Sequence, residues 1–217
     1  MGKDENERLE RRAWPVERLE VRAAEGSAPV IEGYAAVFNQ LSADLGGFRE
    51  RIEPGAFSRS LLDNDIRALW EHNSQYVIGR NRAGTLALAE DDKGLSVEVE
   101  PPDTGWARDL LKSMKRGDVN QMSFGFFVIR DEWRDEDGLV VRVLKEVDLF
   151  DVSVVTYPAY PQTSAEARRI VASGRWPVAG EDRNRQPGPA GDVAGLARTQ
   201  ARRAARRREI ELIEAGD

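Results

Sequence analysis

His72 and Ser123 could together carry out a reaction if the fold brings their side chains into contact. His72 is the only histidine among 217 residues, so a mechanism that needs an imidazole base must use it. It follows the apolar stretch 66–71, where a strand would pass into a loop. A serine hydroxyl becomes a nucleophile for acyl transfer when the fold places such a base beside it. The alternatives are a small filler serine and an ordinary surface histidine.

A serine hydrolase also needs a group that orients the base and donors that stabilise the oxyanion. The segment 144–154 offers Glu146, Asp148 and Asp151 as orienting acids. Asp151 is the best candidate because apolar residues flank it, and a carboxylate in such surroundings must find a partner. Its alternative is a solvent-facing position on a strand. Backbone amides at and near Gly125 are candidates for the oxyanion hole.

Metal-dependent chemistry is disfavoured by the residues present. The chain has no cysteine, so disulfide frameworks, thiolate zinc sites and a cysteine nucleophile are excluded. One histidine leaves only carboxylates as further ligands, and these do not cluster at metal-ligand spacing. We therefore expect neither a metal nor a cofactor.

The stretch 121–128, QMSFGFFV, alternates in a way that is typical of a β-strand. One face would then be apolar and would point to the core of a barrel: Met122, Phe124, Phe126 and Val128. The other face would carry Ser123 and Gly125, and a small hydroxyl beside a glycine leaves room for a substrate backbone.

The elements around this strand predict a mainly β fold with some helix. Strand patterns occur at 16–23, 29–39, 48–52, 66–71, 77–80, 85–90, 95–99, 120–133, 139–149 and 152–157. We expect seven or eight strands from them, in a mixed or antiparallel barrel. Pro54 opens a helix whose buried face would be Phe57, Leu61 and Leu62. Asp103 or Thr104 can cap a second helix that runs to about Arg116, with Trp106, Leu110, Leu111 and Met114 at helical spacing.

Composition divides the chain into four parts. Residues 1–15 form a charged arm that we expect to be disordered, and 16–165 form the globular domain. Residues 166–195 are a flexible linker rich in glycine and proline, and 196–217 form an arginine-rich helical tail. The net charge of −6 argues against a general nucleic-acid binder. Because the sequence lacks a long apolar run and its first residues lack an apolar core, we expect an intracellular protein without a signal peptide.

The candidate residues stand in motifs that resemble those of a known family. His72 lies in LWEHN, Ser123 in QMSFGF and Asp151 in LFDVSVVTYPAYP. In this order, the motifs resemble those of the prohead proteases of tailed double-stranded DNA bacteriophages. Further similar segments are GYAAVFN, RIEPGAFSRSL, IGRNRAGTLAL, EDDKGLSVEVEPP and the helix 106–114. The resemblance covers about residues 17–165.

The resemblance implies a serine endopeptidase with a fold like that of the herpesvirus assemblins, a small closed β-barrel of about seven strands ringed by a few helices. Ser123 would be the nucleophile and His72 the general base. Asp151 would be the orienting acid, in a place where the family often has the longer glutamate. Arg80, after the histidine loop, would fix a water on the oxyanion side or hold the loop, and we favour the second.

The resemblance further implies that the enzyme acts inside the assembling procapsid, in the cytoplasm of a bacterial host. Its substrates and assembly partners would be the major capsid protein and the scaffold, with a homo-oligomer left open and no membrane partner. The tail 196–217 would be removed by self-cleavage, dock on the shell, or touch nucleic-acid phosphates through its arginines. The competing hypotheses are a non-catalytic assembly or scaffold protein of the same fold and, less favoured, a β-rich nucleic-acid-binding module.

Overall fold

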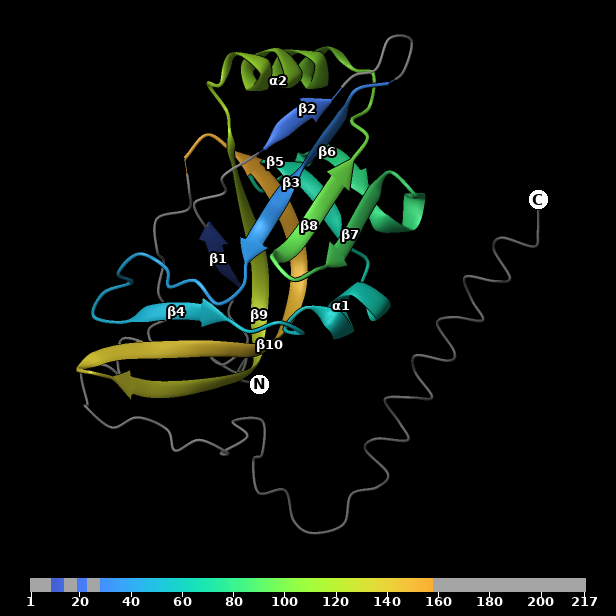
Figure 1. Ribbon diagram of the computed structural model, residues 1–217. Helices are drawn as coiled ribbons and strands as arrows, with labels where there is room; N and C mark the ends of the chain where they lie inside the picture. The colour runs from blue at the N-terminus through green and yellow to red at the C-terminus, as the bar shows by residue number, and fades with distance from the viewer. Residues whose placement is uncertain (1–8, 14–18, 23–27, 158–217) are drawn as a thin grey trace, which may run out of the picture. The chain divides into compact units, whose positions relative to one another are not determined.

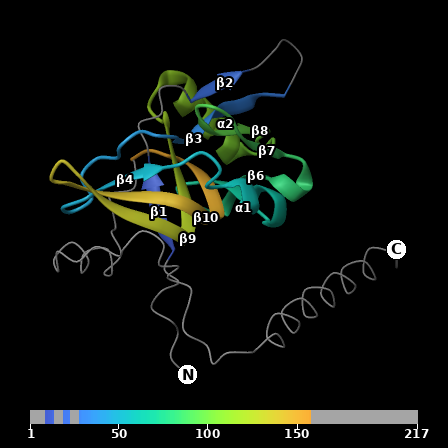
Figure 2. The same cartoon turned by 60° about the horizontal axis from the view of Figure 1, so that its bottom comes forward.

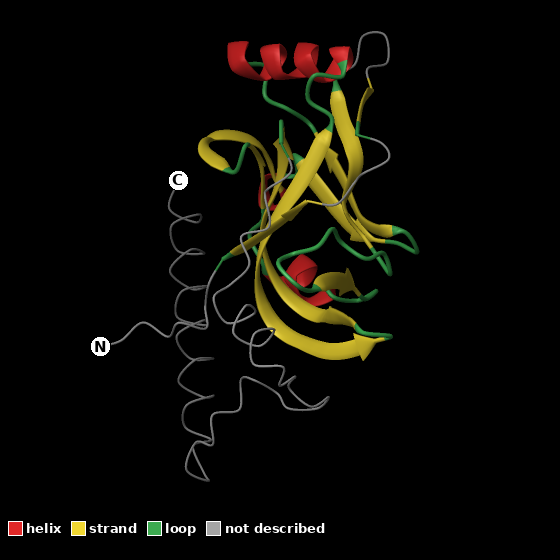
Figure 3. Ribbon diagram, turned by 90° about the vertical axis from the view of Figure 1, so that its left-hand side faces the viewer, coloured by secondary structure: helices red, strands yellow, loops and turns green. Residues whose placement is uncertain are grey.

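The computed structural model describes residues 9–13, 19–22 and 28–157, which form two β-sheets, two α-helices and one 3₁₀ turn (Figure 1). The larger sheet has the order β1 (Glu10–Ala13), β9 (Gln121–Glu136), β10 (Leu139–Val155), β5 (Arg67–Trp70), β6 (Asn73–Arg80), and β4 (Arg49–Ile52) pairs with β10. The smaller sheet has the order β2 (Glu20–Arg22), β3 (Val30–Val37), β8 (Gly94–Val99), β7 (Leu86–Glu90). Strands dominate this part of the chain, as Figure 3 shows.

The main hydrophobic core contains buried side chains from both sheets. Met122, Phe124 and Phe126 of β9 belong to it, together with residues of β3 and β8 such as Ile31 and Val97. The predicted apolar face of β9 is confirmed, and Val128 packs against the same core. Phe124 stacks on Phe126, with ring centroids 5.0 Å apart. Two apolar sheet faces that bury one another in this way supply most of the driving force for folding.

β9 and β10 form a long antiparallel hairpin, and Figure 2 shows β4 beside β10. The separate strands expected at 139–149 and 152–157 are wrong, because β10 runs through both. The interruption is a β-bulge: Leu149 pairs with Phe126 and Asp151 pairs with Gly125, which leaves Phe150 as an extra residue. Phe150 is 55% exposed. The apolar and polar pattern therefore changes phase here without ending the strand.

A closed barrel is not found among the described residues. The ten strands of this part form two separate sheets, so the expectation of seven or eight strands in one barrel is also wrong. β2, β3, β8 and β7 pair with one another and pack on the larger sheet through side chains. Within the expected disordered arm, Glu10–Ala13 is instead a strand, because β9 offers it an antiparallel partner.

The two helices lie close to where they were expected. α2 (Gly105–Arg116) follows the N-cap Thr104 and buries Ala107, Leu110, Leu111 and Met114. Its Trp106 stacks on Trp70, with centroids 6.5 Å apart, which anchors the end of β5. α1 (Ser58–Asp63) is shorter than predicted. Phe57 is fully buried, but Leu62 is 86% exposed, so its assignment to the buried face is wrong. The helix instead turns Ser60 and Leu61 toward the core. The 3₁₀ turn η1 (Asn81–Ala83) follows β6.

The linker 166–195 and the tail 196–217 lie outside the described residues, as do the ends of the predicted globular domain. In the described part, no helix has the length and apolar character needed to cross a bilayer.

Candidate active site

Ser123 lies on β9, on the face opposite the aromatic core. Its neighbours Met122 and Phe124 point into that core, so the period of the strand sends the Ser123 side chain the other way. Ser123 is nevertheless 0% exposed. The expectation that this face is open to substrate is wrong here, because β1 pairs with β9 and Ala13 lies opposite Ser123.

His72 lies in the two-residue turn between β5 and β6, and Trp70 pairs with Asn73 across that turn. Glu71 and His72 have φ values of 56° and 54°. Positive φ at both central positions is the geometry of type I′ hairpin turns, which usually contain asparagine and glycine. Each non-glycine residue in this backbone conformation costs about 1–3 kcal/mol, so surrounding contacts must hold the turn in place. The Glu71 amide donates to the Val154 carbonyl at 2.9 Å, and the Thr156 amide donates to Glu71 Oε1 at 2.5 Å.

The bulge at Phe150 decides where Asp151 points. Without the extra residue, Phe150 would stand opposite Gly125, and Asp151 would stand opposite the core residue Phe124. With it, Asp151 lies opposite Gly125 and shares its face with Ser153, whose hydroxyl donates to Asp151 Oδ1 at 2.8 Å. A bulge that re-aims a side chain in this way is common beside active sites.

The three candidate residues form one continuous hydrogen-bonded chain. His72 Nε2 lies 2.8 Å from Ser123 Oγ, and His72 Nδ1 lies 2.6 Å from Asp151 Oδ1. The His72 and Asp151 side chains are only 6% and 2% exposed. A carboxylate on Nδ1 favours the tautomer with its proton there, which leaves Nε2 free to accept the serine proton. This is the arrangement in which a serine can act as a nucleophile toward an acyl group.

The other acids considered for this role make different contacts. Glu146 is paired with Arg59 and Arg130, and Asp148 accepts a hydrogen bond from Asn64. Asp151 is thus the candidate acid that reaches the imidazole. Arg80 donates to both oxygens of Asp65, each at 2.7 Å. The Arg80 hydrogen bonds lower the pKa of Asp65. They tie Arg80 to the segment between α1 and β5 and not to the turn that carries His72, so the loop-holding role expected for Arg80 stays a prediction.

A buried ionic cluster lies under β1. It consists of five charged side chains: Glu10, Arg12, Glu50, Asp131 and Arg142. Burial alone would raise the pKa of Glu50, but the adjacent Arg12 and Arg142 guanidinium groups outweigh it and hold that pKa below its usual value. Burial likewise opposes the charge of Arg12, and Glu50 overcomes it, so the pKa of Arg12 is raised. The shifts in pKa of Glu50 and Arg12 therefore both favour their charged forms, although the two side chains are buried.

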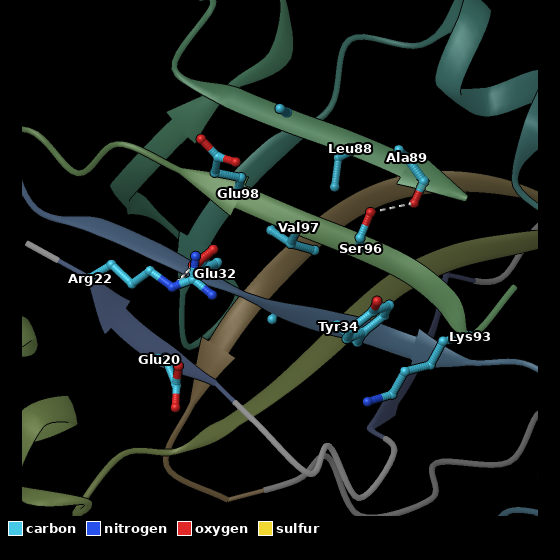
Figure 4. Close-up of a pocket in the computed structure, with 12 residues that line it drawn as sticks. Glu20, Arg22, Glu32, Tyr34, Leu88, Ala89, Lys93, Ser96, Val97 and Glu98 are labelled. Atoms are coloured by element: carbon cyan, nitrogen blue, oxygen red, sulfur yellow. Dashed lines mark hydrogen bonds and ion pairs between the residues drawn. The ribbon is translucent and has the colours of Figure 1, made fainter. Parts of the chain in front are cut away.

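A hollow of about 510 Å³ lies on the smaller sheet, and none of the three candidate catalytic residues lines it. Figure 4 shows its charged rim, where Arg22 faces Glu32 and Lys93 lies beside Tyr34. The described ranges contain no group of three or more histidine or acidic side chains placed to hold a metal ion.

Residues 17–174 match the family of caudovirus prohead serine proteases. The match covers most of the sequence and includes Ser123, His72 and Asp151. The chain belongs to this prohead protease family. It is 33% identical over 153 residues to the prohead protease of Enterobacteria phage HK97, an overlap that covers 68% of this chain and 63% of that protein. The chain thus spans less than two thirds of that relative's length.

A solved structure, that of the bacteriophage T4 capsid assembly protease, aligns with this prohead protease family member at a TM-score of 0.45. The sequence identity is 11%, and the alignment covers 68% of this chain and 96% of the T4 chain.

Sequence reasoning missed several residues around the site of this prohead protease family member. Ser153 carried a usable signal, because it lies two positions after Asp151 and must share its face on a regular strand. The turn at Glu71 and His72 could not be predicted from the sequence, since neither residue is the asparagine or glycine typical of that turn. The contact between Arg12 and Glu50 joins distant segments and left no local pattern.

Proposed function

We propose that this chain is a serine endopeptidase that cleaves capsid and scaffold protein, and its own tail, inside the assembling procapsid of a bacteriophage. The observation that carries the proposal is the hydrogen-bonded chain from Ser123 through His72 to Asp151. Family membership and the HK97 relative, which is named a prohead protease, support the substrate class. The site of action would be the host cytoplasm.

In the proposed reaction, Ser123 Oγ attacks the carbonyl carbon of a peptide bond while His72 Nε2 takes its proton. The C–N bond then breaks, His72 returns the proton to the leaving amine, and an ester on Ser123 remains. Water, deprotonated by His72, hydrolyses that ester and restores the serine. Asp151 holds the imidazole in its productive tautomer and stabilises the imidazolium form. General base catalysis of this type contributes about 10²–10⁴-fold.

The alternative, a non-catalytic assembly protein with the same fold, is disfavoured by the strained turn at His72. Positive φ at Glu71 and His72 costs free energy and serves to place the imidazole between Ser123 and Asp151. A scaffold protein would gain nothing from retaining that geometry.

The test is co-expression of the chain with its cognate major capsid protein, with both polypeptides followed by intact-mass spectrometry. We expect the wild type to shorten the capsid protein and Ser123→Ala to leave it whole, a loss of about 10⁶-fold in kcat. Ser96→Ala, on β8 of the smaller sheet, is the matched control and should cut like the wild type. Uncut capsid protein with the wild type, or equal cutting by Ser123→Ala, would disprove the proposal.

A further inference from the structure

β1 lies against the nucleophile in the manner of a bound peptide. It lies beside β9 (Figure 1) and extends it as an antiparallel strand. In this pairing, Arg12 lies opposite Phe124 and Ala13 opposite Ser123. The Ser123 hydroxyl lies 3.0 Å from the carbonyl oxygen of Arg12. Added strands are a general way for proteins to hold peptides, since main-chain hydrogen bonds bind the backbone and pockets read alternate side chains. The carbonyl presented to the serine belongs to Arg12, so Arg12–Ala13 is the peptide bond at the reactive group.

The side chains of β1 alternate as those of a bound peptide would. Arg11 is exposed, whereas Glu10 and Arg12 are buried on the side of the ionic cluster. The Arg12 guanidinium donates through Nε and Nη2 to the two oxygens of Glu50, the second at 3.0 Å. Nη2 also lies 2.5 Å from Glu10 Oε2. A planar guanidinium matches a carboxylate in this two-point fashion better than any other side chain does.

Glu50 belongs to the body of the fold, and its charge is available to a bound peptide. It lies on β4, paired in register with Arg142 of β10, and is 0% exposed. Arg142 reaches Glu50 through Nη1 at 2.9 Å, but its Nε contacts Asp131 at 2.7 Å. Among the side chains that the structure describes, those of this cluster outside β1 are Glu50, Asp131 and Arg142. β1 adds Arg12, which meets both oxygens of Glu50, together with the carboxylate of Glu10. A cation at position 12 therefore pairs directly with Glu50, whereas a carboxylate there would face it.

We propose that β1 occupies the acyl side of the substrate cleft and that Glu50 is the specificity residue, which selects arginine, and less strongly lysine, immediately before the cleaved bond. This inference rests on the endopeptidase activity proposed above and adds its substrate preference. A site built around a buried charge rejects a side chain that leaves the charge without its partner, because the desolvation of Glu50 is then uncompensated.

While β1 occupies the cleft, it also keeps Ser123 from reacting. A hydroxyl has one proton, so while Ser123 donates it to the Arg12 carbonyl it cannot donate it to His72. The segment thus competes with any peptide that must reach Ser123, and its release exposes the site.

The first test uses the full chain and its Arg12→Glu variant. The introduced carboxylate would face Glu50, so β1 should leave the cleft while the remainder of the site stays intact. A fluorophosphonate probe reports access, because Ser123 Oγ forms a bond to phosphorus, fluoride leaves, and His72 accepts the proton. We expect Arg12→Glu to react at least about 10-fold faster than the wild type, a ratio that corresponds to about 1.4 kcal/mol. Arg12→Lys should stay close to the wild type. Equal reaction rates for wild type and Arg12→Glu would overturn the placement of β1 in the cleft.

The second test gives the Arg12→Glu chain synthetic peptides of residues 7–18 that carry Arg, Lys, Leu or Glu at position 12. Mass spectrometry locates the cut. We expect cleavage between positions 12 and 13 of the Arg and Lys peptides, with kcat/KM at least roughly 10²-fold lower for Leu and Glu. Leu cleaved as fast as Arg would overturn the assignment of Glu50.

Glu50→Gln, in the same Arg12→Glu background, should lower the preference for Arg over Leu by about 10-fold or more, because it keeps the shape of the side chain and removes its charge. Glu53→Gln is the matched control, since Glu53 pairs with Arg134 and Lys145 instead. If Glu50→Gln does not fold, the four peptides still test whether the cleft selects arginine at position 12. Probe labelling without selection for arginine would refute this inference alone, whereas no labelling and no cleavage would refute the endopeptidase proposal and this inference with it.

Discussion

Gly125 and Asp151 face each other in the β9–β10 ladder, and the missing side chain of the glycine leaves the space that the carboxylate occupies. A Cβ at position 125 would lie 2.8 Å from Asp151 Oδ2 and 3.4 Å from its Cγ. The other oxygen, Oδ1, is held by His72 at 2.6 Å and by Ser153 at 2.8 Å. The carboxylate therefore cannot retreat without giving up contacts that orient the imidazole.

Gly125→Ala should consequently impair catalysis more than folding. A displacement of catalytic groups by about 1 Å can cost roughly 10²-fold in rate, and we expect a loss of that order in kcat. Steady-state cleavage of a capsid-protein fragment measures it, alongside urea unfolding. Gly105→Ala is the control, since a Cβ there meets nothing within 4 Å and the residue begins a helix. Full activity in Gly125→Ala would show that the space is not needed.

Asp151→Asn should leave the fold intact and lower kcat by about 10⁴-fold, because an amide no longer favours the His72 tautomer that accepts the serine proton. Asp148→Asn, three residues earlier on β10, changes the same chemical group away from the imidazole. We expect it to cleave at the wild-type rate. Similar rates for both variants would mean that Asp151 does not orient the base.

Phe124 joins the core beneath the candidate site to α1. It is fully buried, stacks on Phe126 and meets the edge of Phe57 with centroids 5.5 Å apart. Phe124→Ala should lower the free energy of unfolding by about 3–5 kcal/mol. Urea titration followed by circular dichroism measures the loss. The control is Leu62→Ala, because Leu62 is 86% exposed, and it should change the free energy of unfolding by less than about 0.5 kcal/mol. A small effect of Phe124→Ala would contradict the close packing of this core.

Glu132 should make stability depend on pH in the acid range. Hydrogen bonds from Arg134 and Lys145 lower the pKa of Glu132 from its ordinary 4.5 to about 2. Since the folded pKa is the lower one, this contribution is fully present above the ordinary value and is lost as pH falls through the folded value. We expect the wild type to exceed Glu132→Gln in urea stability at pH 7, with a gap that closes between about pH 5 and pH 2. A gap that stays constant over that range would refute the assignment.

The sequence by itself determined the chemistry available to this chain and much of its local structure. One histidine and no cysteine left a serine mechanism as the main enzymatic possibility. Alternation along β9 placed Phe124 in the core and Ser123 on the opposite face, because successive side chains on a strand must point in opposite directions. The spacing of Leu110 and Met114 likewise located α2. Such features depend on neighbours within a few residues.

Tertiary structure decided how distant segments meet. The bulge at Phe150 turned Asp151 toward His72, and nothing in the letters marks which residue a ladder leaves unpaired. The arrangement of strands into two sheets also depended on pairings that local patterns leave open. The charged segment Glu10–Ala13 became a strand because Glu50 and Arg142 surround its charges. A charged sequence alone predicts solvation, and only a buried partner of opposite charge makes burial favourable.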